Sequence, residues 1–253
     1  MISPKETFVY YQRLVDYISK RMGEKILMKQ RRTYEEVNRM LQIGDVDFAL
    51  ICTGAFVDGK KEFGLSPIVV PIVRGEPYYH SYIIVHHDRP FSQFQDLKGK
   101  SFAFNDPLSL TGRVFPLYLL QKMGFSPKTF FSQTIYTYSH DNSIEAVANE
   151  VVDGAAVDSL VWDFFQARSV HFVLQTRVLM KSPPFGMPPV VTSTKLPPKL
   201  REKLKGVFLE MEKNPEGKEI LEVLKIDRFI LPPSHLYDSA IEMKRFIQSS
   251  LAK

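Results

Sequence analysis

A short run of hydroxyl side chains and a glycine follows a predicted strand, at the point where a helix should begin. Ser109 and Thr111 flank Leu110, and Gly112 comes next. The first turn of a helix presents backbone N–H groups without intrahelical partners and the positive end of the helix dipole. Hydroxyls add donors there without adding a charge. The pattern therefore favours oxyanion binding, although serine and threonine at such a position also cap helices.

Two further helix starts carry polar side chains. His140 precedes the predicted helix SIEAVANEV, with Asn142 and Glu145 at the spacing of a capping box. Its imidazole could donate to a bound anion, or it could be a solvated or capping residue. Asp158 ends the predicted strand GAAVDS and precedes the helix LVWDFFQARS, so its structural alternative is an N-cap.

Strands and helices alternate around these residues. Short continuous apolar runs read as buried strands, and apolar residues at spacings of three and four read as helices. Such alternation indicates an α/β fold with mostly parallel sheets flanked by helices. A first helix follows Ser3-Pro4. The other main predicted strands span 25–30, 46–52, 79–87 and 100–104, and the main helices span 33–41 and 111–124.

The proline-rich stretch KSPPFGMPPVV interrupts this alternation and favours an extended crossing or hinge. With a second extended pass near residues 78–85, it divides the chain into two α/β lobes. Residues 1–78 and 189–253 are predicted to form the first lobe, and residues 79–188 the second lobe with both hinge passes. A ligand would lie in the cleft between lobes, where strand ends and helix starts converge.

Composition excludes several classes of protein. The chain has 253 residues, a formal net charge of +5 and one cysteine, Cys52, so an intramolecular disulfide is impossible. Its basic residues are scattered, which does not favour nucleic acid. No apolar run is long enough to span a bilayer, and the first residues lack the pattern of a secretory signal.

The sequence also argues against catalysis, cofactors and metals. It contains no Walker loop, no dinucleotide fingerprint and no G-x-S-x-G motif. We therefore expect no enzyme activity and no cofactor. His80, His86 and His87 could suggest a metal site, but adjacent strand residues face opposite sides of a sheet. We therefore expect no metal site there.

Three segments together resemble the phosphate, phosphite and phosphonate-binding proteins of ABC importers. They are YYHSYIIVHHDRPFSQFQDLKGKSFAFNDPLSLTG, SHDNSIEAVANEVVDGAAVDSLVWD and RRTYEEVNRMLQIGDVDFALICTGAFV. The resemblance implies a type II periplasmic-binding-protein fold, a small oxyanion ligand, an ABC permease partner and a periplasmic or other extracytoplasmic location. The ligand residues that it implies are Ser109, Leu110, Thr111, Gly112, His140, Asp158, Tyr79, Thr53 and Phe56.

Three positions that depart from the family pattern narrow the range of expected ligands. Leu110 and Phe56 stand where relatives often have a hydroxyl residue and a tyrosine, so two side-chain donors are missing. Met187 replaces an acidic residue that can meet the amine of an aminophosphonate. Because a buried ammonium without a partner costs several kcal/mol, phosphate, phosphite or an alkylphosphonate is expected instead.

Two alternatives stay open from the sequence. The same fold also serves as the extracytoplasmic input domain of signalling proteins, where ligand-driven closure biases a partner. In addition, relatives have a strand before the segment SPKETF that is central in the first lobe, whereas this chain begins at Met1. We expect that strand to be absent through truncation, which predicts a less stable first lobe. The alternative is that another segment supplies the strand, for example by exchange between protomers.

Overall fold

The computed structural model describes residues 4–251, with side-chain detail from residue 9 to residue 249. The chain forms two compact units. The amino-terminal unit comprises Pro4–Tyr78 and Gly186–Tyr237, and the central unit comprises Tyr79–Phe185 with the chain from Asp238 onward. The strand expected to be missing concerns the chain before residue 4 and lies outside the described residues.

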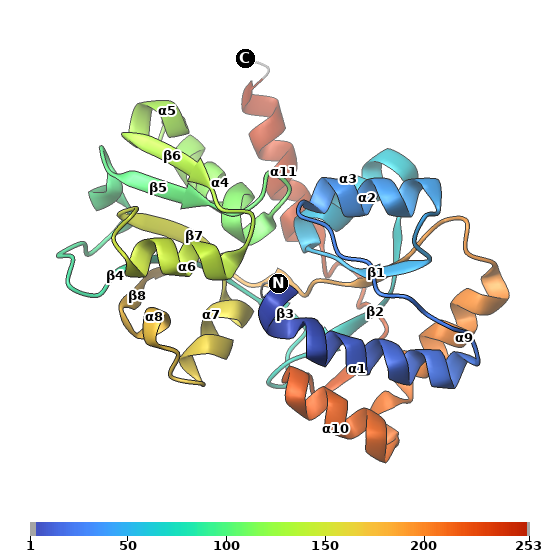
Figure 1. The fold of residues 1–253 in the computed structure, drawn as a ribbon. Helices are drawn as coiled ribbons and strands as arrows, with labels where there is room; N and C mark the ends of the chain where they lie inside the picture. Colours follow the sequence, from blue (N-terminus) through green and yellow to red (C-terminus); the bar gives the residue numbers. More distant parts are fainter. Residues whose placement is uncertain (1–3, 252–253) are drawn as a thin grey trace. The chain divides into compact units, whose positions relative to one another are not determined.

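The amino-terminal unit has a four-stranded sheet in the order β1-β10-β2-β11. Figure 1 labels β1 and β2 of this sheet. Every neighbouring pair in this sheet is antiparallel, so the predicted parallel pairing is wrong here. β1 and β2 do run in the same direction, but β10, the returning strand, lies between them. The elements are α1 (Pro4–Met22), α2 (Tyr34–Ile43), β1 (Phe48–Leu50), α3 (Thr53–Phe63), β2 (Ser66–Ile72), β10 (Val190–Thr192), α9 (Pro198–Leu209), η3 (Met211–Lys213), α10 (Pro215–Leu224) and β11 (Arg228–Ile230).

Helices of this unit begin and end where their sequences specify. Thr33 starts α2 with a capping box, in which its hydroxyl accepts from the N–H of Glu36 and the Glu36 carboxylate accepts from the N–H of Thr33. Gly44 ends the helix at φ 77°, a conformation that suits glycine. In α1, Leu14 and Ile18 are buried against the sheet, which confirms the predicted amphipathic helix.

The predicted strand over residues 25–30 is wrong. The segment is extended but joins no sheet among the described strands. Ile26 and Met28 are half-buried, whereas Leu27 is 71% exposed. The backbone N–H of Ile26 instead donates to the side chain of Ser19, at 3.3 Å.

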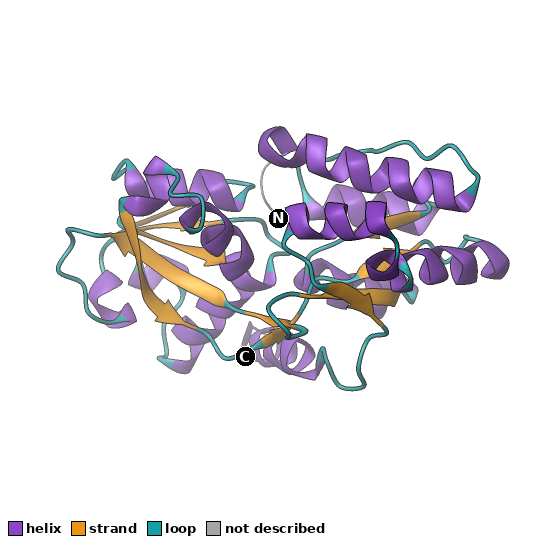
Figure 2. Ribbon diagram, turned by 90° about the horizontal axis from the view of Figure 1, so that it is seen from below, coloured by secondary structure: helices purple, strands orange, loops and turns teal. Residues whose placement is uncertain are grey.

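The central unit has a five-stranded mixed sheet in the order β6-β5-β7-β4-β8. β5 is parallel to β6 and β7, while β4 is antiparallel to both of its neighbours. Helices flank the strands in each unit (Figure 2). The elements are β4 (Ser81–His86), η1 (Phe94–Leu97), β5 (Ser101–Phe104), η2 (Leu110–Val114), α4 (Phe115–Lys122), α5 (Pro127–Phe130), β6 (Gln133–Tyr136), α6 (His140–Ala148), β7 (Gly154–Asp158), α7 (Ser159–Gln166), α8 (His171–Leu174), β8 (Thr176–Lys181) and α11 (Asp238–Leu251). The hinge passes contribute a two-stranded ribbon, β3 (Tyr78–Tyr79) with β9 (Phe185–Gly186).

Side chains on the two faces of β5 pack into different cores. Phe102 stacks on Phe131 with ring centroids 4.4 Å apart and belongs to an aromatic cluster. Ala103 points to the opposite face and packs in the core that includes Ile144 and Val147 of α6. Because both faces are buried, β5 is an apolar run without polar alternation, and its carboxyl end is held firmly where the hydroxyl-rich segment begins.

The last helix packs in the central unit, whereas the predicted boundary placed it in the first lobe. α11 contacts α4, and Phe246 lies edge-on to Tyr118 with ring centroids 5.2 Å apart. The amphipathic pattern of α11 predicts a buried face but does not say which unit covers it. The packing partner was therefore decided by tertiary contacts.

Candidate functional site

The segment after β5 opens a helix through a wide π-helical turn. Ser109 is its N-cap, and the Ser109 hydroxyl accepts a hydrogen bond from the N–H of Gly112 at 3.0 Å. The N–H of Val114 bonds the carbonyl of Ser109, five residues earlier, at 3.0 Å. Leu110 and Thr111 occupy the first turn, where backbone N–H groups have no intrahelical partners. Ser109 therefore caps this helix. The cap uses a lone pair of the Ser109 hydroxyl oxygen, and the hydroxyl hydrogen can still donate to a ligand.

Thr111 is held in place from outside the turn. The hydroxyl of Ser81 donates to the backbone carbonyl of Thr111 at 2.7 Å. The Thr111 hydroxyl itself is fully buried and finds no hydrogen-bond partner among the described residues. A buried donor in this state costs free energy unless a ligand or water satisfies it. This side chain is therefore available for binding.

Asn105 is a candidate site residue that the sequence prediction missed. Its backbone is fixed on both sides, by its N–H to the carbonyl of Gly112 at 3.1 Å and by its carbonyl to the N–H of Tyr138 at 2.9 Å. Its side chain is fully buried, and neither amide atom has a partner within the described part of the chain. The signal was its place just after a strand, since ligands bind beyond the carboxyl ends of parallel strands.

Gly112 stands at the centre of this arrangement. A Cβ atom at this position would lie 2.4 Å from Cβ of Asn105, 3.0 Å from Oγ of Ser109 and 3.2 Å from Cε1 of His140. The first of these distances is far below van der Waals contact, so only glycine fits. The missing side chain lets the three polar residues converge on one stretch of backbone. We call Asn105, Ser109, Thr111, Gly112 and His140 the cradle.

His140 is the first residue of α6, and Ser139 rather than Asn142 caps this helix. Nδ1 of His140 accepts a hydrogen bond from the backbone N–H of Asp158 at 3.2 Å. The accepting nitrogen carries no proton, so the neutral ring carries its proton on Nε2. Burial holds the pKa of His140 well below its ordinary value. The imidazole is therefore a neutral donor through Nε2–H.

Asp158 ends β7 and caps α7, its carboxylate accepting from the N–H of Leu160 at 2.7 Å. The predicted N-cap role is thus confirmed. The side chain is buried, and burial raises the pKa of Asp158 to about 6. A carboxyl group with such a pKa can accept or donate a hydrogen bond near neutral pH, unlike the surrounding donors.

The other three predicted residues are also buried, but their side chains contact residues outside the cradle. Thr53 begins α3 in the amino-terminal unit, and its hydroxyl already donates to the carbonyl of Gly186 at 2.8 Å. Phe56 packs against Tyr237 with ring centroids 4.7 Å apart. Tyr79 lies in β3, with its ring edge-on to Phe185. The cradle, Asp158 and Tyr79 lie in the central unit, whereas Thr53 and Phe56 lie in the amino-terminal unit.

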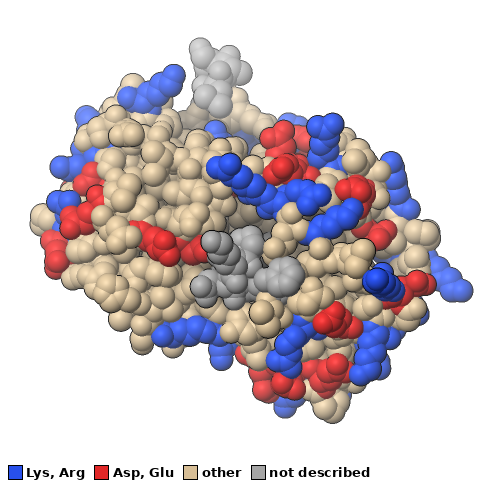
Figure 3. All heavy atoms as spheres, in the orientation of Figure 1, with Lys and Arg blue, Asp and Glu red and all other residues tan. Residues whose placement is uncertain are grey.

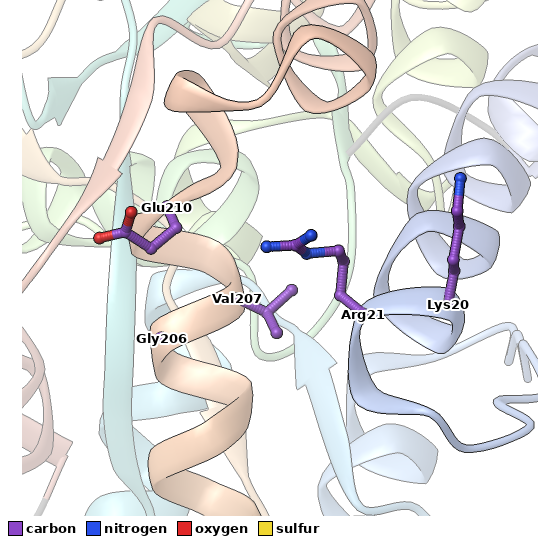
Figure 4. A pocket seen from close by; sticks show the side chains of 5 residues that line it. All are labelled: Lys20, Arg21, Gly206, Val207 and Glu210. Atoms are coloured by element: carbon purple, nitrogen blue, oxygen red, sulfur yellow. The ribbon is translucent and has the colours of Figure 1, made fainter.

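A separate hollow of about 470 Å³ lies in the amino-terminal unit between α1 and α9 (Figure 4). Lys20 and Arg21 line one side, and Val207 and Glu210 the other. Lys20 is paired with Glu216 at 2.9 Å, and the Glu210 carboxylate, which is paired with Lys213 at 3.0 Å, would repel an anion, so the hollow is a poor oxyanion site compared with the cradle. Basic and acidic side chains are also interspersed on the face in Figure 3. Neither feature offers a concentrated basic surface.

The fold and the cradle define a class. The chain has the two-lobe type II periplasmic-binding-protein fold, as predicted. A binding-protein component of an ABC phosphonate transporter from Pseudomonas aeruginosa superposes with a TM-score of 0.91 at 22% identity, over 97% of this chain and 83% of that one. PhnD1 from Prochlorococcus marinus in complex with methylphosphonate gives 0.87 at 19% identity, over 98% and 95%.

Within this class, the chain belongs to the family described as the phosphonate periplasmic substrate-binding proteins of ABC transporters, whose model matches residues 1–237. The phosphonates-binding periplasmic protein of Escherichia coli is 29% identical over 59% of this chain and 45% of that protein. The phosphate-import protein PhnD of Mycolicibacterium smegmatis is 26% identical over 79% and 66%. The matches thus span between about half and two thirds of the length of these curated relatives.

Proposed function

We propose that this chain is the solute-binding component of an ABC importer and that it captures a small oxyanion: phosphate, phosphite or an alkylphosphonate. The family and the fold support a binding protein rather than an enzyme. The family description also names a transporter component, which favours import over sensing. By the same resemblance, we place the protein in the periplasm or an equivalent extracytoplasmic space.

The observation that carries the proposal is a pair of buried polar side chains beside Gly112. The hydroxyl of Thr111 and the amide of Asn105 are fully buried and unsatisfied within the described residues. Leaving each group unpaired costs about 1–3 kcal/mol. A tetrahedral oxyanion at the first turn of the helix would pair with these donors, with the turn's N–H groups and with Nε2–H of His140.

We propose that Asp158 makes binding depend on the protonation state of the ligand. An ionised carboxylate in a buried site repels a fully deprotonated dianion but accepts a hydrogen bond from a protonated oxygen. In its protonated form, the Asp158 carboxyl group would donate instead. The site would thereby favour ligands that carry an exchangeable proton near neutral pH.

The amino-terminal unit is proposed to supply further ligand contacts through Thr53 and Phe56, with Tyr79 from the hinge pass. Since the Thr53 hydroxyl is already committed to Gly186, its contribution would come from its backbone N–H in the first turn of α3. Met187 is buried and uncharged. With no carboxylate at this position, we expect an alkylammonium ligand to bind poorly.

Thermal unfolding against phosphate, phosphite, methylphosphonate, aminoethylphosphonate and sulfate tests the proposal. A ligand present at about 1,000 times its dissociation constant should stabilise the protein by roughly 4 kcal/mol. We expect a shift with at least one of the first three compounds and little with aminoethylphosphonate. No shift with any oxyanion would refute the binding function.

Paired variants connect such a shift to the cradle. Thr111→Ala and Asn105→Ala should remove the ligand-induced shift. Ser126→Ala is the matched control, because Ser126 caps the short helix α5 of the same unit through the N–H of Thr129 but lies in an exposed contact. A ligand shift that survives both cradle substitutions would place the ligand elsewhere.

A further inference from the structure

Two histidines and an aspartate gather where β4 ends, apart from the cradle residues. β4 ends at His86, and the chain then turns through His87 and Asp88. The imidazole rings of His86 and His87 stack with centroids 4.6 Å apart and an interplanar angle of 26°. The sequence-based expectation that these two side chains face opposite ways is therefore wrong. The alternation of a strand applies only within the strand, and His87 is already in the turn.

The hydrogen bonding of His87 fixes where its ring proton lies. Nδ1 of His87 is 2.9 Å from the backbone carbonyl oxygen of Gln175. A carbonyl oxygen only accepts, so Nδ1 carries the proton, and Nε2 of the neutral ring has a lone pair. A backbone carbonyl on the far nitrogen is the usual way in which proteins orient a histidine that binds metal.

The lone pair on Nε2 of His87 lies close to a second hydrogen-bond acceptor, the Asp88 carboxylate. Nε2 of His87 lies 3.1 Å from a carboxylate oxygen of Asp88. Two acceptors at this separation repel each other unless a cation lies between them. The cation is either a second proton on the ring or a metal ion. Two ligands on one tetrahedral Zn²⁺ ion, each about 2.0–2.1 Å from the metal, are about 3.3 Å apart, which is close to the observed distance.

His86 supplies the third donor. Its Nδ1 lies 3.9 Å from the other carboxylate oxygen of Asp88. The long hydrogen bond of 3.3 Å that Nδ1 accepts from the Asp88 N–H must open for the Nδ1 lone pair to bind a metal ion. The ligand atoms of all three side chains lie within 4.8 Å of one another. The Asp88 side chain is 76% exposed, so its rotation can bring the carboxylate closer to Nδ1 of His86. The His86 side chain is only 11% exposed, so packing around it holds its ring in place.

We propose that His86, His87 and Asp88 form a binding site for a divalent transition-metal ion such as Zn²⁺. Two imidazole nitrogens and one carboxylate oxygen suit Zn²⁺, Co²⁺, Ni²⁺ and Cu²⁺ rather than Mg²⁺ or Ca²⁺, which take oxygen ligands. Three protein ligands leave a fourth tetrahedral position for water or an exogenous ligand.

Nearby positive charges do not prevent this use. The Arg89 guanidinium is paired with the carboxylate of Glu150 at 2.6 Å. The Arg177 guanidinium donates to the backbone carbonyls of Arg89 and Phe91. The net charge contributed by the three proposed ligands is that of the single Asp88 carboxylate. The site therefore keeps a local attraction for a cation.

Titration calorimetry with ZnCl₂ tests the proposal on the full chain without a histidine tag, in a buffer that does not chelate metals. We expect one equivalent of Zn²⁺ to bind at pH 7.5, with no heat from MgCl₂. His87→Ala and Asp88→Asn should each weaken binding by more than about tenfold. His171→Ala removes an exposed histidine from α8 of the same unit and should leave Zn²⁺ binding unchanged.

Coordination itself is read from Co²⁺, whose visible absorption becomes intense in a tetrahedral nitrogen and oxygen site. The band should appear with the wild-type protein and be lost in His87→Ala. His87 and Asp88 lie at the surface, so their variants stay informative even if replacing the buried His86 prevents folding. Absence of Zn²⁺ binding, or binding that His87→Ala leaves unchanged, would overturn the proposal. The occupant of the gap would then be a proton in an imidazolium–carboxylate pair.

Discussion

The buried carboxylate of Asp158 leads to a sharp prediction about stability and pH. Its pKa is raised from 3.8 to about 6 by burial. Because its pKa is higher in the folded state, the ionised carboxylate destabilises the folded protein. This destabilisation is complete above pH 6 and disappears as the pH falls from 6 towards 3.8. A shift of about two pKa units corresponds to about 3 kcal/mol.

Asp158→Asn removes the charge and keeps an oxygen that can accept from the N–H of Leu160. We expect the variant without ligand to be more stable than the wild type by up to about 3 kcal/mol at pH 8. The difference should shrink to near zero at pH 4, where both side chains are neutral. Urea denaturation followed by circular dichroism at pH 8, 7, 6, 5 and 4 gives the free energy of unfolding of each protein.

A second aspartate of the same unit provides the control. Burial raises the pKa of Asp153, but hydrogen bonds from the backbone and hydroxyl of Ser101 outweigh it, and the net shift is downwards. Asp153→Asn should therefore destabilise the protein above pH 4, with the opposite sign. If Asp158→Asn is less stable than the wild type at pH 8, or its effect does not change with pH, then burial does not control this carboxyl group as we describe.

Three further substitutions test the positioning of the cradle by urea denaturation. Gly112→Ala should lose about 1–3 kcal/mol or more, because the new Cβ would meet Cβ of Asn105 at 2.4 Å; an unchanged stability would show that the turn relaxes freely. Ser81→Ala should cost about 1–3 kcal/mol by leaving the carbonyl of Thr111 without its 2.7 Å partner, and a loss under about 0.5 kcal/mol, which is the usual scale of surface substitutions, would make that contact incidental. Phe102→Ala should cost about 3–5 kcal/mol, because its ring stacks on Phe131, and a smaller loss would mean that the aromatic cluster repacks around the cavity.

Local chemistry was readable from the sequence. Hydroxyls before a glycine at a helix start predicted the N-cap at Ser109 and the backbone donors that follow it, because capping depends on residues within one turn. The Asp158 cap was readable for the same reason. The α/β alternation and the family resemblance together indicated a type II binding-protein fold, which the comparisons confirm.

Features that depend on residues distant in the sequence could not be predicted from the sequence. Residues 25–30 contain a short apolar run typical of a strand, but a strand forms only where another strand pairs with it, and none of the described strands does. β10 returns from far along the chain to lie between β1 and β2, which makes their neighbours antiparallel. The unit that covers α11 was likewise fixed by packing and not by its own pattern.

The hydroxyls of the cradle were thus determined by the sequence alone, as residue types that follow a strand and open a helix. Only the tertiary structure added Asn105, the proton on Nε2 of His140 and the raised pKa of Asp158. Each of these depends on burial or on a hydrogen bond between residues distant in the sequence, such as Asp158 N–H to His140 at 3.2 Å. The physical reason is that a cap is satisfied within one turn, whereas desolvation and long-range pairing are properties of the folded core.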